Sequence, residues 1–248
     1  EVSGTGRRGD DPAFRGSEAG PRQMVGPHEL KEKANVTIKL YSRYRNSAGQ
    51  RVRIVLNLKG VPYQYMAVDD MQSDAYRRVN PQGLLPAVEI DGEVFGQSTA
   101  IIDWLERTYP EPSVYPDDPK DRMRAIAFAQ FVACEIHPIH NHRVRDYLTG
   151  EEGWSEDKSM AWYAHWISTG LATLETMLRQ RPRKTAFCFG DSPSIADIYL
   201  VPVLFNARWY GFPLDDFPLI RGIDAACEQL EAFRLAGPEM QPDYPGPG

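Results

Sequence analysis

Hydrophobic and polar residues alternate in regular patterns only from Val36 onward. Residues 36–41 alternate with period two and carry β-branched side chains, which predicts a half-buried strand. Residues 50–59 place apolar side chains at three-to-four spacing, which predicts an amphipathic helix that ends before Gly60. A second predicted strand at 61–68 completes a β-α-β unit whose crossover is long enough for a parallel pair.

The remaining pattern separates two regions. Strands at 87–90 and 93–95 flank Asp91-Gly92, a hairpin signal, and a helix is expected over about 98–107. Four prolines within 109–119 predict a stiff linker. Beyond it only helical periods occur, over about 120–147, 156–179, 194–210 and 218–236. We therefore expect an α/β domain at 36–109, a linker at 110–119 and an all-α domain at 120–248.

Composition narrows the class of protein. The chain of 248 residues is 42% hydrophobic and can bury a real core, but residues 1–35 lack periodicity and are expected to form a disordered tail. The net charge of −6 gives no basic footprint for nucleic acid, and no apolar run approaches the roughly 18 residues that span a membrane. Three widely separated cysteines argue against a disulfide framework and favour a reducing, cytoplasmic setting.

Three loops carry candidate chemistry in the first domain. Asn46 and Ser47 occupy helix-capping positions, where they either only cap the helix or help its amino end hold an anion. Pro86 enters a strand, and a cis peptide bond there would turn the backbone of Leu85 toward an extended peptide ligand; the sequence fits either isomer. The residues from Gln97 open another helix with polar groups that could hold a carboxylate.

Two motifs in the helical region have different meanings. Ser194-Ile195-Ala196-Asp197 fits a capping box and is interpreted as a fold-building signal. Three histidines within 137–142 suggest a metal, but Pro138 and the spacing of three and then two give no ligand face, so no metal is expected. Instead one or two of these histidines, or Arg143, are expected to line a cleft and bind a substrate carboxylate.

Together these pieces resemble the glutathione transferase superfamily, and more narrowly its zeta class, which includes maleylacetoacetate and maleylpyruvate isomerases. The matching stretches keep their order over about 36–244: LYSRYRNSAGQRVRIVLNLKGVPYQY, NPQGLLPAVEIDGEVFGQSTAIIDWLE, CEIHPIHNHR, FGDSPSIADIYLVP and the closing QPD. The resemblance implies a thioredoxin-like domain that holds glutathione as cofactor. It also implies an all-helical domain that supplies the acceptor site, usually within a homodimer.

The resemblance also implies roles for individual residues. Gln97 and Ser98 would grip the γ-glutamyl group of glutathione, Leu85 before a cis Pro86 would pair with its cysteinyl backbone, and Gln82 belongs to the same cofactor-binding set. The turn that contains Asn46 and Ser47 would face the sulfur.

This chain departs from the family pattern at two places. Zeta enzymes usually carry serine where Asn46 stands, so either Asn46 Nδ2 or Ser47 Oγ could activate the thiol; lowering its pKa by two units requires about 2.7 kcal/mol. The family's late substrate-binding arginine aligns with Trp209, and the preceding Arg208 points about 100° away on a helix. Arg45 and His137 match residues of the maleylpyruvate isomerase site, and Arg143 is a further candidate for binding substrate.

Three functional hypotheses follow. The leading one is a glutathione-dependent cis–trans isomerase acting on a maleyl-type or other conjugated substrate. The alternative is a transferase that consumes glutathione in conjugating or reductively dehalogenating an electrophile, which Trp209 in place of arginine favours. The third is a non-catalytic binding module on the same scaffold.

Overall fold

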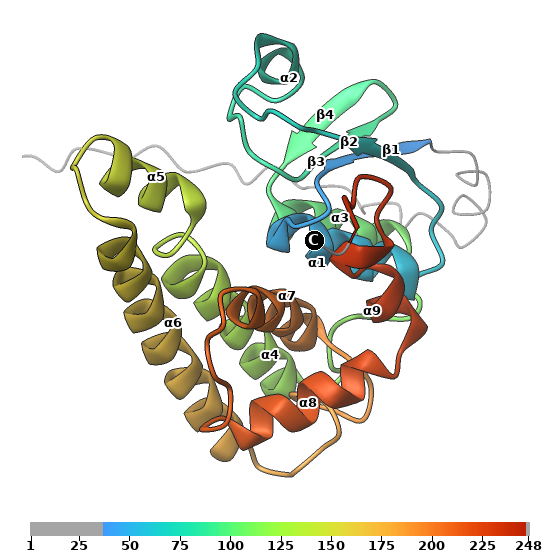
Figure 1. Cartoon of the computed structure of the whole chain (residues 1–248). Coiled ribbons are helices and arrows are strands. Elements are labelled where there is room, and N and C mark those ends of the chain that lie inside the picture. Colours follow the sequence, from blue (N-terminus) through green and yellow to red (C-terminus); the bar gives the residue numbers. More distant parts are fainter. Residues whose placement is uncertain (1–36, 247–248) are drawn as a thin grey trace, which may run out of the picture. The chain divides into compact units, whose positions relative to one another are not determined.

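A computed structural model describes residues 37–246, and the tail expected at 1–35 lies outside the described residues. Strands β1 (Ile38–Ser42), β2 (Gln64–Ala67), β3 (Ala87–Ile90) and β4 (Glu93–Gly96) form a mixed sheet in the order β2-β1-β3-β4 (Figure 1). β1 and β2 are parallel, whereas β3 is antiparallel to both β1 and β4. The predicted β-α-β unit and hairpin are therefore confirmed, with Asp91 and Gly92 at positive φ in the turn.

Two of the three helices in this region were predicted. Helices α1 (Ser47–Leu58) and α3 (Ser98–Thr108) pack on each other and on the sheet, where Leu40 and Val88 are buried. The sequence pattern placed the start of α1 three residues too late, because its first turn is polar. Helix α2 (Asp74–Val79) was missed because it is short and buries only Tyr76, so it has no hydrophobic period.

The helical region begins with a correction. A single helix over 120–147 was expected, but α4 (Pro119–Phe131) passes into a π-helical segment, Val132–Ile136, and α5 (His142–Gly150) starts anew. The break has a local cause, because Pro138 cannot continue the helix and the Asn141 side chain caps α5 by accepting from Arg143 N.

The remaining helices follow the predicted periods more closely. Helix α6 (Glu156–Arg179) has the predicted bounds, and α7 (Ile195–Trp209) begins with the predicted capping box at Ser194 and Asp197. The expected helix over 218–236 is two helices, α8 (Pro218–Glu228) and α9 (Glu231–Leu235). Leu230 is extended between them, which turns the chain so that α9 contacts α1.

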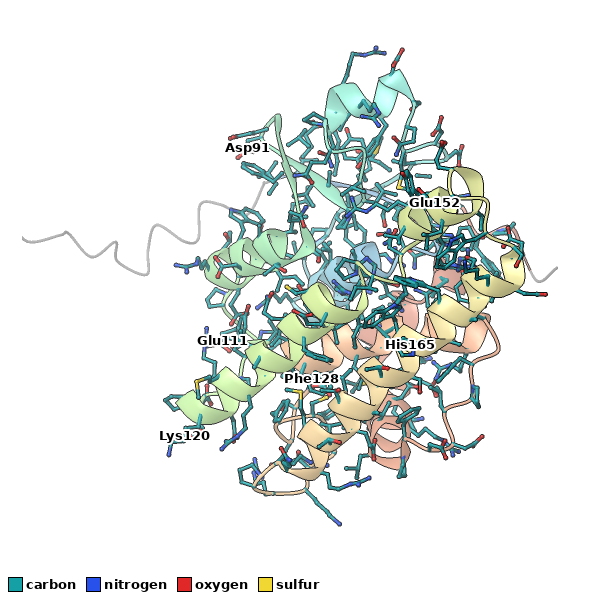
Figure 2. All side chains as sticks on the ribbon, turned by 90° about the vertical axis from the view of Figure 1, so that its left-hand side faces the viewer. Asp91, Glu111, Lys120, Phe128, Glu152 and His165 are labelled. Carbon is teal, nitrogen blue, oxygen red and sulfur yellow. The ribbon has the colours of Figure 1, made fainter. Side chains whose placement is uncertain are left out.

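Side-chain packing joins the sheet and the helices into one core. Phe128 is completely buried, and its ring centre lies 5.7 Å from that of Phe189. Figure 2 shows Phe128 in the interior, whereas Asp91 and Lys120 lie at the periphery of the molecule. Helix α1 packs between the sheet and α7 (Figure 1). Among residues 37–246 no helix is both long and apolar enough to span a membrane.

Candidate active site

A cavity of about 490 Å³ opens where the two regions meet. On one side lie the β1–α1 loop with the start of α1, residues 82–86 and the start of α3. On the other side lie eight of the residues between Ala133 and Asp146, together with Tyr163 from α6, Asn206 from α7 and Tyr210 at the end of α7. The volume falls within the range typical of small-molecule sites.

The amino end of α1 is the part of the cavity best suited to an anion. Asn46 caps the helix: its Oδ1 accepts from Gly49 N at 2.5 Å and its carbonyl accepts from Gln50 N at 2.8 Å. The amides of Ser47 and Ala48 belong to the first turn, whose N–H groups have no acceptor within a helix. Together with the helix dipole they provide partial positive charge at the cavity wall.

Gly49 is required for this cap. A Cβ at this position would lie 2.2 Å from Ser42 Oγ and 2.7 Å from Asn46 Oδ1, closer than atoms can approach. Any larger residue would therefore push away the capping side chain.

Asn46 and Ser47 face different partners, although the sequence left both open as thiol activators. The Ser47 hydroxyl donates to the carbonyl of Pro202 at 3.4 Å and accepts from Asn206 Nδ2, so it ties α1 to α7. The Oδ1 of Asn46 is used by the cap, which leaves its Nδ2 as the group able to donate to a ligand.

The predicted cofactor-binding residues come together on the same side. Leu85 and Pro86 line the cavity and their peptide bond is cis. The preceding carbonyl, that of Leu84, accepts from Tyr76 Oη at 2.7 Å and from Asn80 Nδ2 at 2.9 Å, so the end of α2 fixes this loop.

Gln97 and Ser98 form the next part of this wall. Gln97 has a φ of 71°, unusual for a residue with a side chain, and its Nε2 donates to Gln82 Oε1 at 3.0 Å. Such backbone strain persists only where surrounding structure enforces it, often at a ligand site. Ser98 is buried in the first turn of α3, and all three side chains line the cavity.

Arg45 crosses from the β1–α1 loop to the helical region. Its guanidinium lies 4.5 Å from the ring centre of Trp209 and 5.7 Å from that of Tyr210. Its Nη2 also lies 3.2 Å from Nε2 of His142, the nitrogen that the Tyr210 hydroxyl approaches to 2.9 Å. Burial, with Arg45 as the next cause, lowers the pKa of His142.

His137 lies directly after the π-helical segment and lines the cavity. Burial, and then the positive charge of Arg51, holds its pKa well below the usual value, so the ring is neutral at pH 7. Its Nε2 lies 3.2 Å from Asn141 Nδ2, an amide that can only donate. His137 Nε2 is therefore the acceptor and Nδ1 carries the proton.

The other three substrate-binding candidates divide between cavity and surface. Arg143 lines the cavity, whereas Arg208 and Trp209 do not. Arg208 forms a close ion pair with Asp224 and a longer one, 3.9 Å, with Glu228. Trp209 is half exposed and contacts the site through Arg45. No group of three or more His, Cys, Asp or Glu side chains suited to a metal occurs among residues 37–246.

Sequence reasoning missed several residues that shape the site. Arg51 lines the cavity but was assigned only to an amphipathic helix; two arginines on the apolar side of that helix were the available signal. Asp243, in the QPD stretch, accepts from Tyr44 N and from the Tyr65 hydroxyl, both at 2.9 Å. It holds the loop that carries Arg45 and Asn46 from a distance of 199 residues along the chain, which no local pattern reveals.

Comparisons with known proteins agree with this geometry. Residues 40–113 match the family described as glutathione S-transferase, N-terminal domain, and residues 160–234 match its C-terminal domain. Maleylpyruvate isomerase from Ralstonia sp. is 45% identical over 210 residues, which cover 83% of this chain and 99% of the relative. The holo structure of a maleylpyruvate isomerase, described as a bacterial zeta-class glutathione S-transferase, superposes with a TM-score of 0.80 at 45% identity, covering 83% of this chain and 99% of that one.

A further structure carries ligands. Maleylacetoacetate isomerase from Methylobacterium extorquens AM1, with bound malonate and glutathione, superposes with a TM-score of 0.81 at 35% identity and covers 84% of this chain and all of its own. Since these relatives match over nearly their whole length in sequence and in fold, the chain belongs to the glutathione S-transferase family and, within it, to the zeta class.

Proposed function

We propose that the protein is a glutathione-dependent cis–trans isomerase of a maleyl-type or other conjugated unsaturated acid. The observation that carries this proposal is the composition of one cavity. It joins the amino end of α1, suited to a sulfur anion, with Arg45, His137 and Arg143, suited to a substrate that bears carboxylates.

The cavity wall fits glutathione by its chemistry. The amino end of α3 and the strained Gln97 would hold the γ-glutamyl group, and the backbone of Leu85 would pair with the cysteinyl residue. The amino end of α1 would face the sulfur. When bound, glutathione supplies a thiolate that can add reversibly to a conjugated double bond, so that the bond can rotate before it re-forms.

The protein's own groups would position the reactants and stabilise charge. Asn46 Nδ2 and the first-turn amides of α1 would donate to the sulfur and favour its ionised form. Arg45 and Arg143 would bind the substrate carboxylates. The neutral His137 would donate from Nδ1 to the carbonyl oxygen on which negative charge develops, a donor that needs no reorganisation during the reaction.

The direct test supplies maleylpyruvate and glutathione and follows both compounds. We expect the trans isomer to form with glutathione recovered in full, and no turnover when glutathione is omitted. Asn46→Ala should lower kcat/KM by about tenfold or more, whereas Ser47→Ala should have the smaller effect on rate because its hydroxyl serves α7. Isomerisation at the same rate without glutathione would contradict the proposal.

A second candidate function keeps the cofactor site but consumes glutathione, as a transferase would. It is favoured by the residues at the end of α7: Trp209 stands where the family's late arginine is expected, and the neighbouring Arg208 forms an ion pair with Asp224. Depletion of glutathione in proportion to product would identify this activity. Arg45→Ala separates the two, because it should raise KM for a diacid far more than for a neutral electrophile in the isomerase.

We also propose a homodimer in a reducing, cytoplasmic setting. The exposed apolar side chains Phe95, Met123 and Ile126 support an interface, since the family usually forms dimers. The cysteines Cys134, Cys188 and Cys227 are all free, which suits a reducing compartment. Sedimentation equilibrium with Met123→Glu should shift a dimer toward monomer; a wild-type monomer would contradict the first proposal.

A further inference from the structure

Two buried arginines of α1 differ in their hydrogen bonding. Arg53 is completely buried and fully engaged: it donates to the carbonyls of Ala236, Arg43 and Tyr44 and to Ser42 Oγ, at 3.0–3.3 Å. Arg51, two residues earlier, is only 2% exposed, yet its Nε and Nη2 have no hydrogen-bond partner among the described residues. Arg53 therefore serves the fold, and the purpose of Arg51 must lie elsewhere.

The surroundings of Arg51 do not neutralise its charge. No ion pair within residues 37–246 includes it. Its guanidinium lies 4.1 Å from the ring centre of Tyr199 on α7. The hydroxyl of Tyr199 is hydrogen-bonded to that of Thr99. Burial lowers the pKa of Arg51 to about 10, so it is still a cation at neutral pH.

The other titratable side chains around Arg51 in the described part of the chain include no carboxylate. They come from the π-helical segment and the turn after it, namely Cys134, His137 and His140. Burial lowers the pKa of both histidine rings, and the positive charge of Arg51 lowers each pKa further. A buried cation without an acidic partner destabilises a fold unless an anion is supplied from outside.

The position of Arg51 indicates where that anion would lie. Arg51 lines the cavity, as does Ser47, four residues earlier on the same face of α1. One helical turn separates them, about 6 Å along the axis. Arg51 therefore lies one turn inside the amino end of α1, the end that is proposed above to face the sulfur of glutathione.

We propose that Arg51 is the buried counter-charge of the bound glutathione thiolate. It does not need to touch the sulfur, because a positive charge that lines the same cavity and is shielded from water acts more strongly there than it would in solvent. The helix amides and Asn46 supply direct donors, and Arg51 supplies the net charge that they lack. This inference rests on the glutathione-dependent reaction proposed above.

The test compares Arg51→Met, Arg51→Lys and Arg53→Met in the full chain. The pKa of enzyme-bound glutathione is measured by titrating its ultraviolet thiolate absorbance, and Tm is measured on the same samples without ligand. Arg51→Met should raise the thiol pKa by about one pH unit, which means about tenfold less thiolate below both pKa values. Arg51→Lys should keep the thiol pKa closer to that of the wild type.

Stability separates this role from a structural one. Exchanging an unpaired buried charge for an apolar side chain of similar volume is often neutral or stabilising, so the Tm of Arg51→Met should stay level or rise. Arg53→Met should lower Tm sharply, because it leaves four acceptors without their donor.

The outcomes are distinct. A wild-type complex with no thiolate absorbance near neutral pH would overturn both this inference and the proposed function. A wild-type thiolate that persists unchanged in Arg51→Met would overturn this inference alone, as would a Tm that falls in Arg51→Met while the thiol pKa stays constant. A raised thiol pKa with an unchanged or higher Tm would support it.

Discussion

The two walls of the cavity are built from different parts of the chain. The sheet-side wall, made by the β1–α1 loop with α1, residues 82–86 and α3, combines two helix ends and the Leu85 backbone with polar side chains, and hydrogen bonds beneath it fix their positions. The helical wall, made by residues 133–146 with Tyr163 and the end of α7, offers side chains such as His137, Arg143 and Tyr210. Backbone groups move only with the fold, whereas side chains change by single substitutions. We therefore expect single substitutions to change the chemistry of the helical wall more readily than that of the sheet-side wall.

The largest expected effect tests whether the sheet-side wall depends on its buried support. Arg53→Met should lower the free energy of unfolding by about 3 kcal/mol or more, because the carbonyls of Arg43 and Tyr44 lose their donor. Denaturant unfolding measures this. Arg234→Met, an exposed arginine on α9, is the control and should change stability by less than about 0.5 kcal/mol. Equal effects of the two changes would show that the sheet-side wall does not depend on Arg53 for its support.

A somewhat smaller effect is expected at the cap of α1. Gly49→Ala should destabilise the protein by about 2 kcal/mol and weaken glutathione binding, because the added Cβ collides with Ser42 Oγ and Asn46 Oδ1. Calorimetric titration with glutathione gives the affinity. In Gly150→Ala, the last residue of α5, nothing lies within 4 Å of the new Cβ, so affinity should be retained. Unchanged binding in Gly49→Ala would show that the cap does not position the sulfur site.

The helical wall should be the part that responds to pH. Burial lowers the pKa of His140 to about 4, below its value in the unfolded chain, so the unfolded state takes up the proton first as the pH falls. Stability should therefore fall by about 2 kcal/mol between pH 7 and pH 5 on account of this residue.

The measurement is denaturant unfolding at both pH values. His140→Phe should reduce the pH dependence by the part that His140 contributes while keeping an aromatic ring against Tyr163, and His137 and His142, whose pKa values burial also lowers, account for the part that remains. The control His165→Phe, which changes an exposed histidine on α6, should keep the pH dependence of the wild type. A pH dependence as large in His140→Phe as in the wild type would show that His140 is not one of its sources.

The smallest effect concerns the contact between the walls. Trp209→Ala should raise KM for a diacid by about three- to fivefold, because the half-exposed ring holds Arg45 through a cation–π contact of about 0.5 to 1 kcal/mol. The KM of Trp209→Phe, which keeps an aromatic ring, should lie between that of the wild type and that of Trp209→Ala. A KM that is unchanged in both would show that Arg45 needs no aromatic support.

Local signals predicted most of the fold. Asp91-Gly92 specifies its own turn, and the long period of α6 gave its bounds, because these features depend on neighbouring residues. The π-helical segment was missed, since a π-helix has the same apolar residues as the α-helix it interrupts. The segment also packs closely on a distant element, α6, because a Cβ at Gly170 would lie 2.6 Å from the Ile136 side chain.

The site was predictable where it depends on a motif and not where it depends on distant contacts. The residues around Leu85 and Gln97 were predicted from loop motifs that resemble those of the family, and the structure places them along one cavity. The partners of Arg45 were not, because His142 and Tyr210 lie 97 and 165 residues away in sequence. Arg208 was a candidate by its place on α7, but its direction is set by Asp224 on α8.

The tie between Asp243 and Tyr44 has a consequence for work with parts of this protein. The loop that carries Arg45 and Asn46 is anchored far outside its sheet in two ways: Tyr44 N donates to Asp243, and Arg53 donates both to the carbonyl of Tyr44 and to that of Ala236. A fragment restricted to the thioredoxin-like half would lack both anchors, and its β1–α1 loop would not be held in place. Protease cleavage between α9 and Tyr244 should likewise impair catalysis before the fold is lost, even though the cut lies outside every catalytic motif.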